Sequence, residues 1–283
     1  MTAGLDGVLP LLVCPHCGAR LGRHAAAVVG CRAGHRFDIA KQGYLSLLSK
    51  LARTDTGDSA DMVAARLDFL GAGHYQSILD DVAVAVQAGP VLEIGAGTGY
   101  YLAGVLRLLA DRPGHQEAIG VALDASRYAA RRAAAAHPRI GSVVADAWSR
   151  LPIGDGVAGT VLSVFAPRNA DEISRVLSED GRLVAVTPEP GHLAELRGPL
   201  GLLTIDPGKP ERLADAFAGR LQVVERQWIV RELRLSRPDV LALVLMGPSA
   251  RHLQPDQLAA AVNILPEISA VTLAVTVSVL ERA

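Results

Sequence analysis

Short apolar runs alternate with longer amphipathic stretches through the middle of this 283-residue chain. The runs are bounded by glycine, proline or aspartate, which is typical of buried strands. The stretches between them carry apolar residues three or four positions apart, which is typical of helices. Strands are expected at 90–95, 118–124, 142–146, 159–165 and 181–188, and helices at 100–111, 126–137 and 170–179. This alternation predicts an α/β fold with a mostly parallel sheet, helices on both faces, and ligands at the carboxyl ends of the strands.

The flanking segments complete this picture. A helix is expected from about residue 61 to the glycines before Tyr75, and a second one over 76–89. Further helices follow residue 210, with two strands at 221–230 and 269–280 that would close the sheet as an antiparallel edge. We therefore expect a small module at 1–53, a helical linker at 54–88 and the main α/β domain at 89–283.

Charge is distributed unevenly along the chain, although its net value is only −1. Residues 1–53 hold seven basic and two acidic side chains, so the remainder holds 21 basic and 27 acidic ones. A basic module beside an acidic body is a hint of phosphate binding, although an ordinary solvated surface explains charge alone equally well. The first residues do not resemble a secretory signal, and no apolar run approaches the roughly 20 residues that span a bilayer, so we expect a cytoplasmic protein.

All three cysteines lie in the first module, in the stretch CPHCGARLGRHAAAVVGCRAGH. The spacing is C-x2-C, thirteen residues, then C-x3-H, and two such pairs can fold together around one tetrahedral ion. Thiolates with an imidazole suit zinc, and four protein ligands leave no position for a reacting water. The predicted zinc site is therefore structural, with ligands Cys14, Cys17, Cys31 and His35.

The first strand of the main domain runs into the glycine-rich turn VLEIGAGTGYY. A dinucleotide fingerprint would need glycine three residues after Gly97, where the chain has Tyr100. Acidic residues instead end the second and third strands, at Asp124 and Asp146. This E-x-G-x-G-x-G pattern with its two acids resembles the S-adenosylmethionine-dependent methyltransferases of the seven-stranded, Rossmann-like fold.

The resemblance implies a set of cofactor-binding residues. Glu93 and residues 95–97 of the glycine turn would lie near the methionine part, Asp124 would accept the ribose hydroxyls, and Asp146 would lie beside the adenine. An acid often found in the fourth-strand region of the superfamily is replaced by Gly159. The expected cofactor residues in this part of the chain are Glu93, Gly95, Ala96, Gly97, Thr98, Asp124, Ala125, Asp146 and Ala147.

Other stretches narrow the resemblance to one family. FDIAKQGYLSLL follows the cysteine module, and GDSADMVAARLDFLGAGHYQSIL, VFAPRNADEISRVL, VTPEPGHLAELRGPLGLL and MGPSARH follow later. Together they resemble the RlmA family of 23S rRNA (guanine-N1)-methyltransferases, and within it the tylosin-resistance branch. The resemblance implies methylation of a 748-type guanosine in a 23S rRNA hairpin near the macrolide site, macrolide resistance, and a homodimer. It also adds Tyr75 and His192 to the expected S-adenosylmethionine-binding residues.

The N1 atom of neutral guanine carries a proton that must leave, so a general base is expected. Acidic or imidazole side chains near strand ends are Asp171, Glu189, His192 and Glu195, and the sequence does not choose among them. We take His192 and Glu195 as the working candidates for a base or a positioning group. A small-molecule methyltransferase with a structural zinc, and a non-catalytic zinc-ribbon protein that binds nucleic acid, remain as alternative functions.

Overall fold

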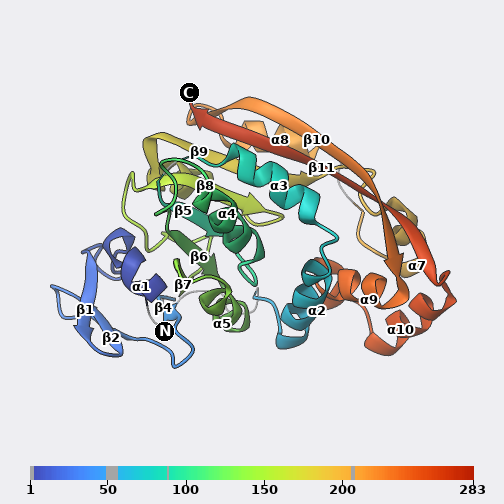
Figure 1. The fold of residues 1–283 in the computed structure, drawn as a ribbon, viewed down its shortest axis with the longest axis horizontal. Helices are drawn as coiled ribbons and strands as arrows, with labels where there is room; N and C mark the ends of the chain where they lie inside the picture. Colours follow the sequence, from blue (N-terminus) through green and yellow to red (C-terminus); the bar gives the residue numbers. More distant parts are fainter. Residues whose placement is uncertain (1–2, 49–56, 88, 205–207) are drawn as a thin grey trace.

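The computed structural model describes residues 3–48, 57–87, 89–204 and 208–283 (Figure 1). The expected module boundary between residues 53 and 54, together with the basic residues Lys50 and Arg53, lies outside the described residues. The expected linker end at residue 88 does so too. In the part of the chain that is described, no helix is long and apolar enough to cross a membrane.

The main body is built on one twisted sheet, which has eight strands among the described residues. Their order is β10-β11-β9-β8-β5-β6-β7-β4, and β4 to β9 run parallel while β11 is antiparallel to both of its neighbours. The predicted α/β class and antiparallel edge are confirmed, and β4 is an added edge strand that the pattern did not predict. The strands are β4 (Leu45–Ser46), β5 (Val91–Ile94), β6 (Gly120–Asp124), β7 (Ile140–Val144), β8 (Ala158–Val164), β9 (Leu177–Pro188), β10 (Leu221–Ser236) and β11 (Ile268–Arg282).

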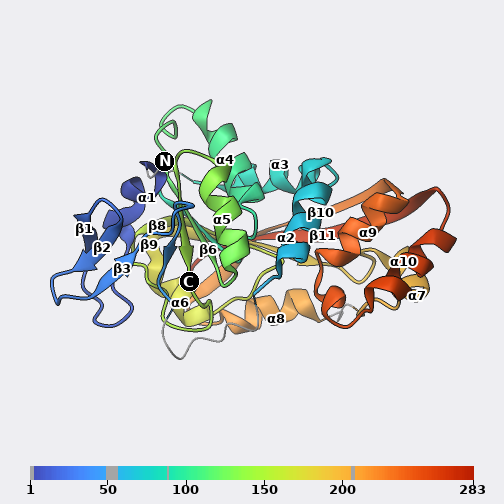
Figure 2. The same ribbon diagram turned by 90° about the horizontal axis from the view of Figure 1, so that it is seen from below.

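Helices cover both faces of this sheet, as Figure 2 shows from below. One face carries α3 (Gln76–Ala85), α4 (Tyr100–Ala110) and α5 (Arg127–Ala136), and the other carries α6 (Ala170–Val176) and α8 (Lys209–Ala216). The prediction for α6 was wrong at its end, because residues 177–179 already belong to β9. Leu177 is fully buried and pairs with Ala158, which favours the sheet over another helical turn.

The N-terminal helix α1 (Ala3–Val8) packs on β7, on the side opposite to α5. Consecutive residues of β7 face these two helices: a side chain on Gly141 would meet Val8, and the Ser142 hydroxyl donates to the Ala130 carbonyl of α5. Residues 145–157, which connect β7 to β8, contain no helix. The segment at the start of the chain therefore covers the face of β7 that a crossover helix would otherwise cover.

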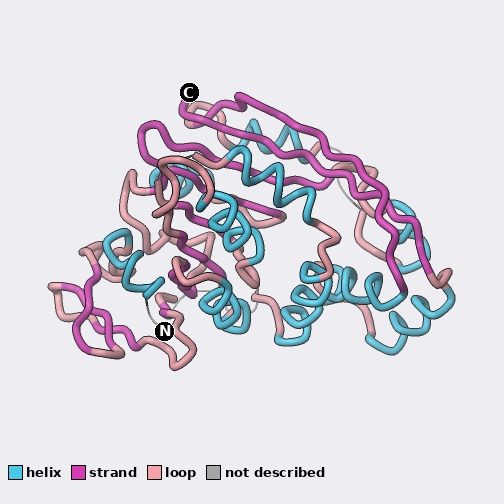
Figure 3. Tube along the Cα trace, viewed as in Figure 1, coloured by secondary structure: helices cyan, strands magenta, loops and turns pink. Residues whose placement is uncertain are grey.

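The cysteine-bearing module forms a second, small sheet at one end of the molecule (Figure 1 and Figure 3). Its antiparallel strands are β1 (Leu21–Ala25), β2 (Val28–Cys31) and β3 (Arg36–Asp38), preceded by the 3-10 helix η1 (Leu9–Leu11). Leu12, Leu21 and Val29 are buried in one cluster with side chains of the main body. Helix α1 before the module and strand β4 after it both dock at the β7 edge, so the module is joined to the sheet at both ends.

A group of helices packs at the other end of the molecule (Figure 1). We call α2 (Ala60–Gly71), α9 (Arg237–Leu245), α10 (Pro255–Ile264) and the 3-10 helix η2 (Pro248–Arg251) the helical group. Ser59 caps α2 by accepting from the Met62 amide, and α7 (Ala194–Leu200) packs against α10 and β11. The helix predicted over α2 is confirmed, while the one predicted over 76–89 ends at Ala85, because Val86 already has an extended backbone. The parallel strands lie between the helical group and the cysteine module (Figure 1).

Candidate functional site

The four predicted metal ligands come together at one end of the small sheet. Their ligand atoms all lie within 4.8 Å of one another. The Cys17 and Cys31 sulfurs are 3.6 Å apart, and His35 Nδ1 is 3.4 Å from Cys31 Sγ and 3.5 Å from Cys14 Sγ. Zn–S and Zn–N bonds of about 2.3 and 2.0 Å in a tetrahedron give ligand separations of about 3.5–3.8 Å. The residues present therefore fit a tetrahedral zinc ion.

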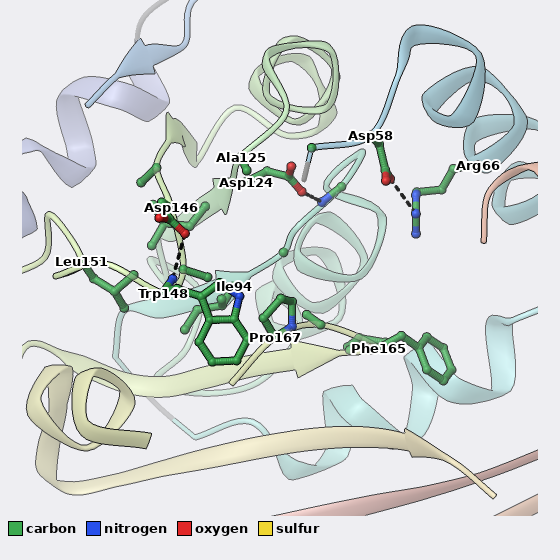
Figure 4. Close-up of a pocket in the computed structure, with 18 residues that line it drawn as sticks. Asp58, Arg66, Ile94, Asp124, Ala125, Asp146, Trp148, Leu151, Phe165 and Pro167 are labelled. Atoms are coloured by element: carbon green, nitrogen blue, oxygen red, sulfur yellow. Dashed lines mark hydrogen bonds and ion pairs between the residues drawn. The ribbon is translucent and has the colours of Figure 1, made fainter. Parts of the chain in front are cut away.

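A cavity, here named the first cavity, opens at the carboxyl ends of β5, β6 and β7. Figure 4 shows Asp124 in its middle, Asp146 and Trp148 on one side, and Asp58 with Arg66 on the other. The charged side chains that line it are these three aspartates and Arg66, among the described residues. The remaining labelled residues of the lining are apolar or aromatic: Ile94, Ala125, Leu151, Phe165 and Pro167. Such a lining suits a nucleoside with a cationic substituent better than a pyrophosphate.

The glycine turn brings backbone close to this cavity. A side chain on Gly95 would approach Ala166 Cβ to 2.6 Å, and Gly97 has a φ of 53°, which an L-residue rarely adopts. The Gly97 amide donates to Asp124 Oδ2 at 2.8 Å, and the Ser126 amide donates to Oδ1 at 2.8 Å. These two bonds fix the carboxylate at the end of β6 and leave further lone pairs for a ligand. Burial raises the Asp124 pKa, and the two amide bonds oppose that rise.

Glu93 lies behind the glycine turn and does not line the first cavity. Its side chain is 1% exposed, and its Oε2 accepts from the Leu102 amide of α4 at 3.1 Å. Burial raises the Glu93 pKa to about 8, against the lowering effect of the Leu102 bond. In this position the residue stabilises the junction between β5 and α4.

A second cavity adjoins the first and shares Arg66, Phe165 and Ala166 with it. It is larger, at about 400 Å³, and is bordered by β9, α7 and the helical group. Tyr75, Phe165 and His192 form an aromatic cluster in its wall, with the Phe165 and His192 rings stacked at 5.9 Å between centroids. Phe165 has a φ of 53°, and a non-glycine residue held in that region is a feature of ligand sites.

The structure places the predicted cofactor residues in three positions. Lining the first cavity are Gly95, Gly97, Asp124, Ala125, Asp146 and Ala147. Buried behind it are Glu93, Ala96 and Thr98. Tyr75 and His192, which the family resemblance assigns to the cofactor, line the second cavity and not the first, with Tyr75 Oη 3.4 Å from His192 Nε2.

Neither cavity is lined by the remaining acidic candidates. Glu195 accepts from the Thr272 amide and hydroxyl on β11. Glu189 accepts from the Thr276 hydroxyl, and Asp171 forms an ion pair with Arg220 on the surface. Of the four candidates for a base, only His192 lies at a cavity.

The sequence of this chain is similar to one known protein family and to named proteins over nearly its full length. The family described as RlmA, N-terminal, a zinc ribbon, matches residues 12–49. A Streptomyces fradiae protein named 23S rRNA (guanine(748)-N(1))-methyltransferase is 44% identical, over 96% of this chain and 97% of its own. A Micromonospora griseorubida protein named as a 23S rRNA (guanine-N(1)-)-methyltransferase is 44% identical as well, over 95% and 96%.

The chain belongs to the RlmA-type 23S rRNA (guanine-N1)-methyltransferase family. It is accordingly an S-adenosylmethionine-dependent methyltransferase with a structural zinc ion, and the resemblance seen in the sequence is confirmed. A Haloferax volcanii methyltransferase solved with the Trm112 activator matches at 20% identity and a TM-score of 0.51, over 80% of this chain and 98% of that one. That likeness confirms the methyltransferase fold.

Several lining residues of this methyltransferase were missed in the sequence. Phe165 is the last residue of the strand predicted at 159–165 and Arg168 lies three residues beyond it, and the rule that ligands bind at carboxyl ends of parallel strands was a sufficient signal for both. Trp148 follows Asp146 by two residues and had the same signal. The sequence offered no such signal for Asp58 and Arg66. Asp58 precedes α2 and Arg66 lies on α2, so neither follows a strand of the sheet, although both line the first cavity.

Proposed function

We propose that this methyltransferase transfers the methyl group of S-adenosylmethionine to N1 of a guanine in a 23S rRNA hairpin. The proposal is carried by the 44% identity, over nearly the full length of both chains, to the enzyme named for guanine 748. The target is then a 748-type guanosine near the macrolide site, and its methylation would protect ribosomes from tylosin-like drugs. The reaction would take place in the cytoplasm, where ribosomes are found.

The first cavity would hold the methyl donor. Asp124 would accept both ribose hydroxyls, and the lone pairs that its oxygens keep beyond the Gly97 and Ser126 bonds support this role. Asp146, whose carboxylate is fixed by the Trp148 amide and the Ser149 hydroxyl, would lie beside the adenine. When bound, S-adenosylmethionine supplies a sulfonium-activated methyl group. The chain's own part is to orient the donor and exclude water around it.

The second cavity would hold the target base. Guanine N1 is hidden by pairing in a stem, so the base must come from a loop or be flipped out of the helix. A flipped base needs an aromatic or apolar wall for stacking, and Tyr75, Phe165 and His192 supply one. Phe165 and Ala166 line both cavities, so donor and base would meet there.

The zinc module would hold the RNA. Its described basic side chains include Arg20, Arg32, Arg36 and Lys41, and phosphate binding by such side chains is tolerant of sequence. Cys14, Cys17, Cys31 and His35 would bind the zinc ion that fixes this small sheet. A homodimer would present two such modules to one RNA, and sedimentation velocity at micromolar concentration measures its presence.

Primer extension on 23S rRNA after reaction with the purified enzyme tests the proposal. N1-methylguanine cannot form a Watson–Crick pair, so reverse transcriptase is expected to stop one nucleotide before the modified guanosine. Nucleoside analysis of the same RNA identifies the methylated base. Absence of N1-methylguanine would contradict the proposal. Methyl transfer to a macrolide in a parallel reaction would favour a small-molecule methyltransferase instead.

A further inference from the structure

Three guanidinium groups line the second cavity, and two of them are engaged by the protein itself. Arg66 Nη2 donates to Asp58 and to the Met246 carbonyl, at 2.7 and 2.8 Å. Arg197 Nη2 donates to the carbonyls of Pro190 and His192.

Arg168 is different. Its side chain forms no hydrogen bond or ion pair with any residue in the described parts of the chain, although it is partly buried. Burial lowers the Arg168 pKa. A guanidinium placed in this way at a cavity wall is available to a ligand oxygen.

The position of Arg168 is fixed by its neighbours along the chain. Pro167 precedes it, and Asn169 follows it as the N-cap of α6, accepting from the Glu172 amide. The Asn169 side chain also donates to the Trp148 carbonyl at the first cavity. Arg168 is thus held between a strand end and a helix cap, four residues after β8.

The second cavity offers no carboxylate that could take a proton, among its described lining residues. Its titratable lining groups are Tyr75, His192 and the three arginines, while β9 and α9 present only apolar side chains. His192 Nδ1 accepts from the Ala274 amide at 3.3 Å, so the neutral ring carries its proton on Nε2, which faces Tyr75 Oη. Both ring nitrogens are therefore engaged by the protein, and neither is open to accept the N1 proton of a guanine bound in the cavity.

We propose that Arg168 binds O6 of the target guanine and stabilises the negative charge that forms when N1 loses its proton. This inference rests on the proposed function. The N1–H bond breaks and its proton passes to solvent, the charge left on N1 is shared with O6, and N1 then forms a bond to the methyl carbon as the S–CH3 bond breaks. The products are N1-methylguanine, S-adenosylhomocysteine and one proton, so no side-chain base is consumed. Removing one preorganised donor aimed at a developing oxyanion typically costs about 100- to 1,000-fold in rate.

The same contact would select the base. Guanine presents an acceptor at position 6, whereas adenine presents an amino donor there, which a guanidinium cannot bind. Arg168 would then favour guanine over adenine at the target position without contacting the adjacent nucleotides.

Single-turnover methylation of a 23S rRNA hairpin at saturating S-adenosylmethionine tests this inference over a range from about pH 6.5 to about pH 9.5. We would compare wild type, Arg168→Gln, Arg168→Lys and the control Arg112→Gln, which removes a positive charge beyond the far end of α4. Arg168→Gln is expected to lose about 100-fold or more in rate near neutral pH. Its rate is also expected to keep rising with pH beyond the point at which the wild-type rate levels off, because guanine N1 then ionises less readily. Arg168→Lys is expected to recover part of the loss, and affinity for S-adenosylmethionine is expected to stay within about threefold in every variant.

Two results would overturn the inference. One is a rate within about threefold of wild type for Arg168→Gln. The other is an equal rate loss at every pH together with weaker RNA binding and a shallower salt dependence, which would make Arg168 a phosphate contact. Either result leaves the proposed function intact as long as wild type produces N1-methylguanine, whereas absence of that product in wild type contradicts the proposed function itself.

Discussion

Glu93→Gln is expected to stabilise the protein at neutral and higher pH. The buried carboxyl has a pKa of about 8, compared with 4.5 when it is solvated. Between these values the folded chain keeps a proton that the unfolded chain has lost, so stability falls as pH rises through this window and is fully present only below it. Glutamine cannot ionise, and its carbonyl oxygen can still accept from the Leu102 amide as Glu93 does.

The size of the effect follows from the pKa difference. Holding the Glu93 proton costs roughly 3 kcal/mol at pH 7, and the cost grows by roughly 2 kcal/mol between about pH 6 and about pH 8. Urea denaturation of both proteins with zinc present, followed by circular dichroism at several pH values, gives the difference in unfolding free energy. Glu117→Gln, on the surface before β6, is the matched control. A difference between wild type and Glu93→Gln that does not grow with pH would refute the argument that Glu93 is buried in its protonated form.

Three further predictions concern the zinc module, the donor site and the docking of α1. Cys17→Ser, at the exposed zinc ligand, is expected to lower RNA affinity at least tenfold in filter binding and to leave S-adenosylmethionine affinity nearly unchanged. Asp124→Asn is expected to weaken S-adenosylmethionine binding about 10- to 100-fold in calorimetry, because one of its acceptor oxygens becomes a donor. Gly141→Ala is expected to lower the unfolding free energy by about 1–3 kcal/mol, because its Cβ would lie 2.0 Å from Val8 Cγ2, and Val8→Ala is expected to reduce that loss in the double variant.

The parts that could be predicted from the sequence are those in which neighbouring residues determine the structure. The apolar runs located every strand from β5 to β11, because each run is bounded by turn residues and all of these strands except β10 are largely buried. The cysteine spacing predicted the four ligands because the two members of each pair are only a few residues apart, and all four ligand atoms lie together in the structure. Asp124 and Asp146 were found because each lies at the carboxyl end of its strand, Asp124 as the last residue of β6 and Asp146 two residues after β7.

The parts that escaped prediction depend on contacts between distant segments. Strand β4 is only two residues long and exists because it pairs with β7, about a hundred residues later. Arg66 reaches the first cavity only because α2 packs against α9. Its guanidinium donates to the carbonyl of Met246, the C-cap residue of α9. Glu93 matched the methyltransferase pattern and was expected at the methionine part, but its side chain lies beneath the glycine turn. A motif determines the residue type at a position, whereas packing decides on which side of the backbone its side chain lies.

The added strand β4 also bears on the proposed RNA-holding role of the zinc module, because it ties that module to the strand that leads to the first cavity. The chain leaves the zinc sheet after β3, pairs as β4 with Val143 and Val144 of β7, and continues with a bond from the Leu47 amide to the Val144 carbonyl. Strand β7 leads directly to Asp146 at the first cavity. Helix α1 holds the other end of the module on the same strand, through its contact at Gly141. Because two separate attachments meet on the strand that leads to Asp146, RNA bound to the zinc module would be held in a fixed position relative to the methyl donor. A fixed position is the requirement for aligning N1 with the methyl group.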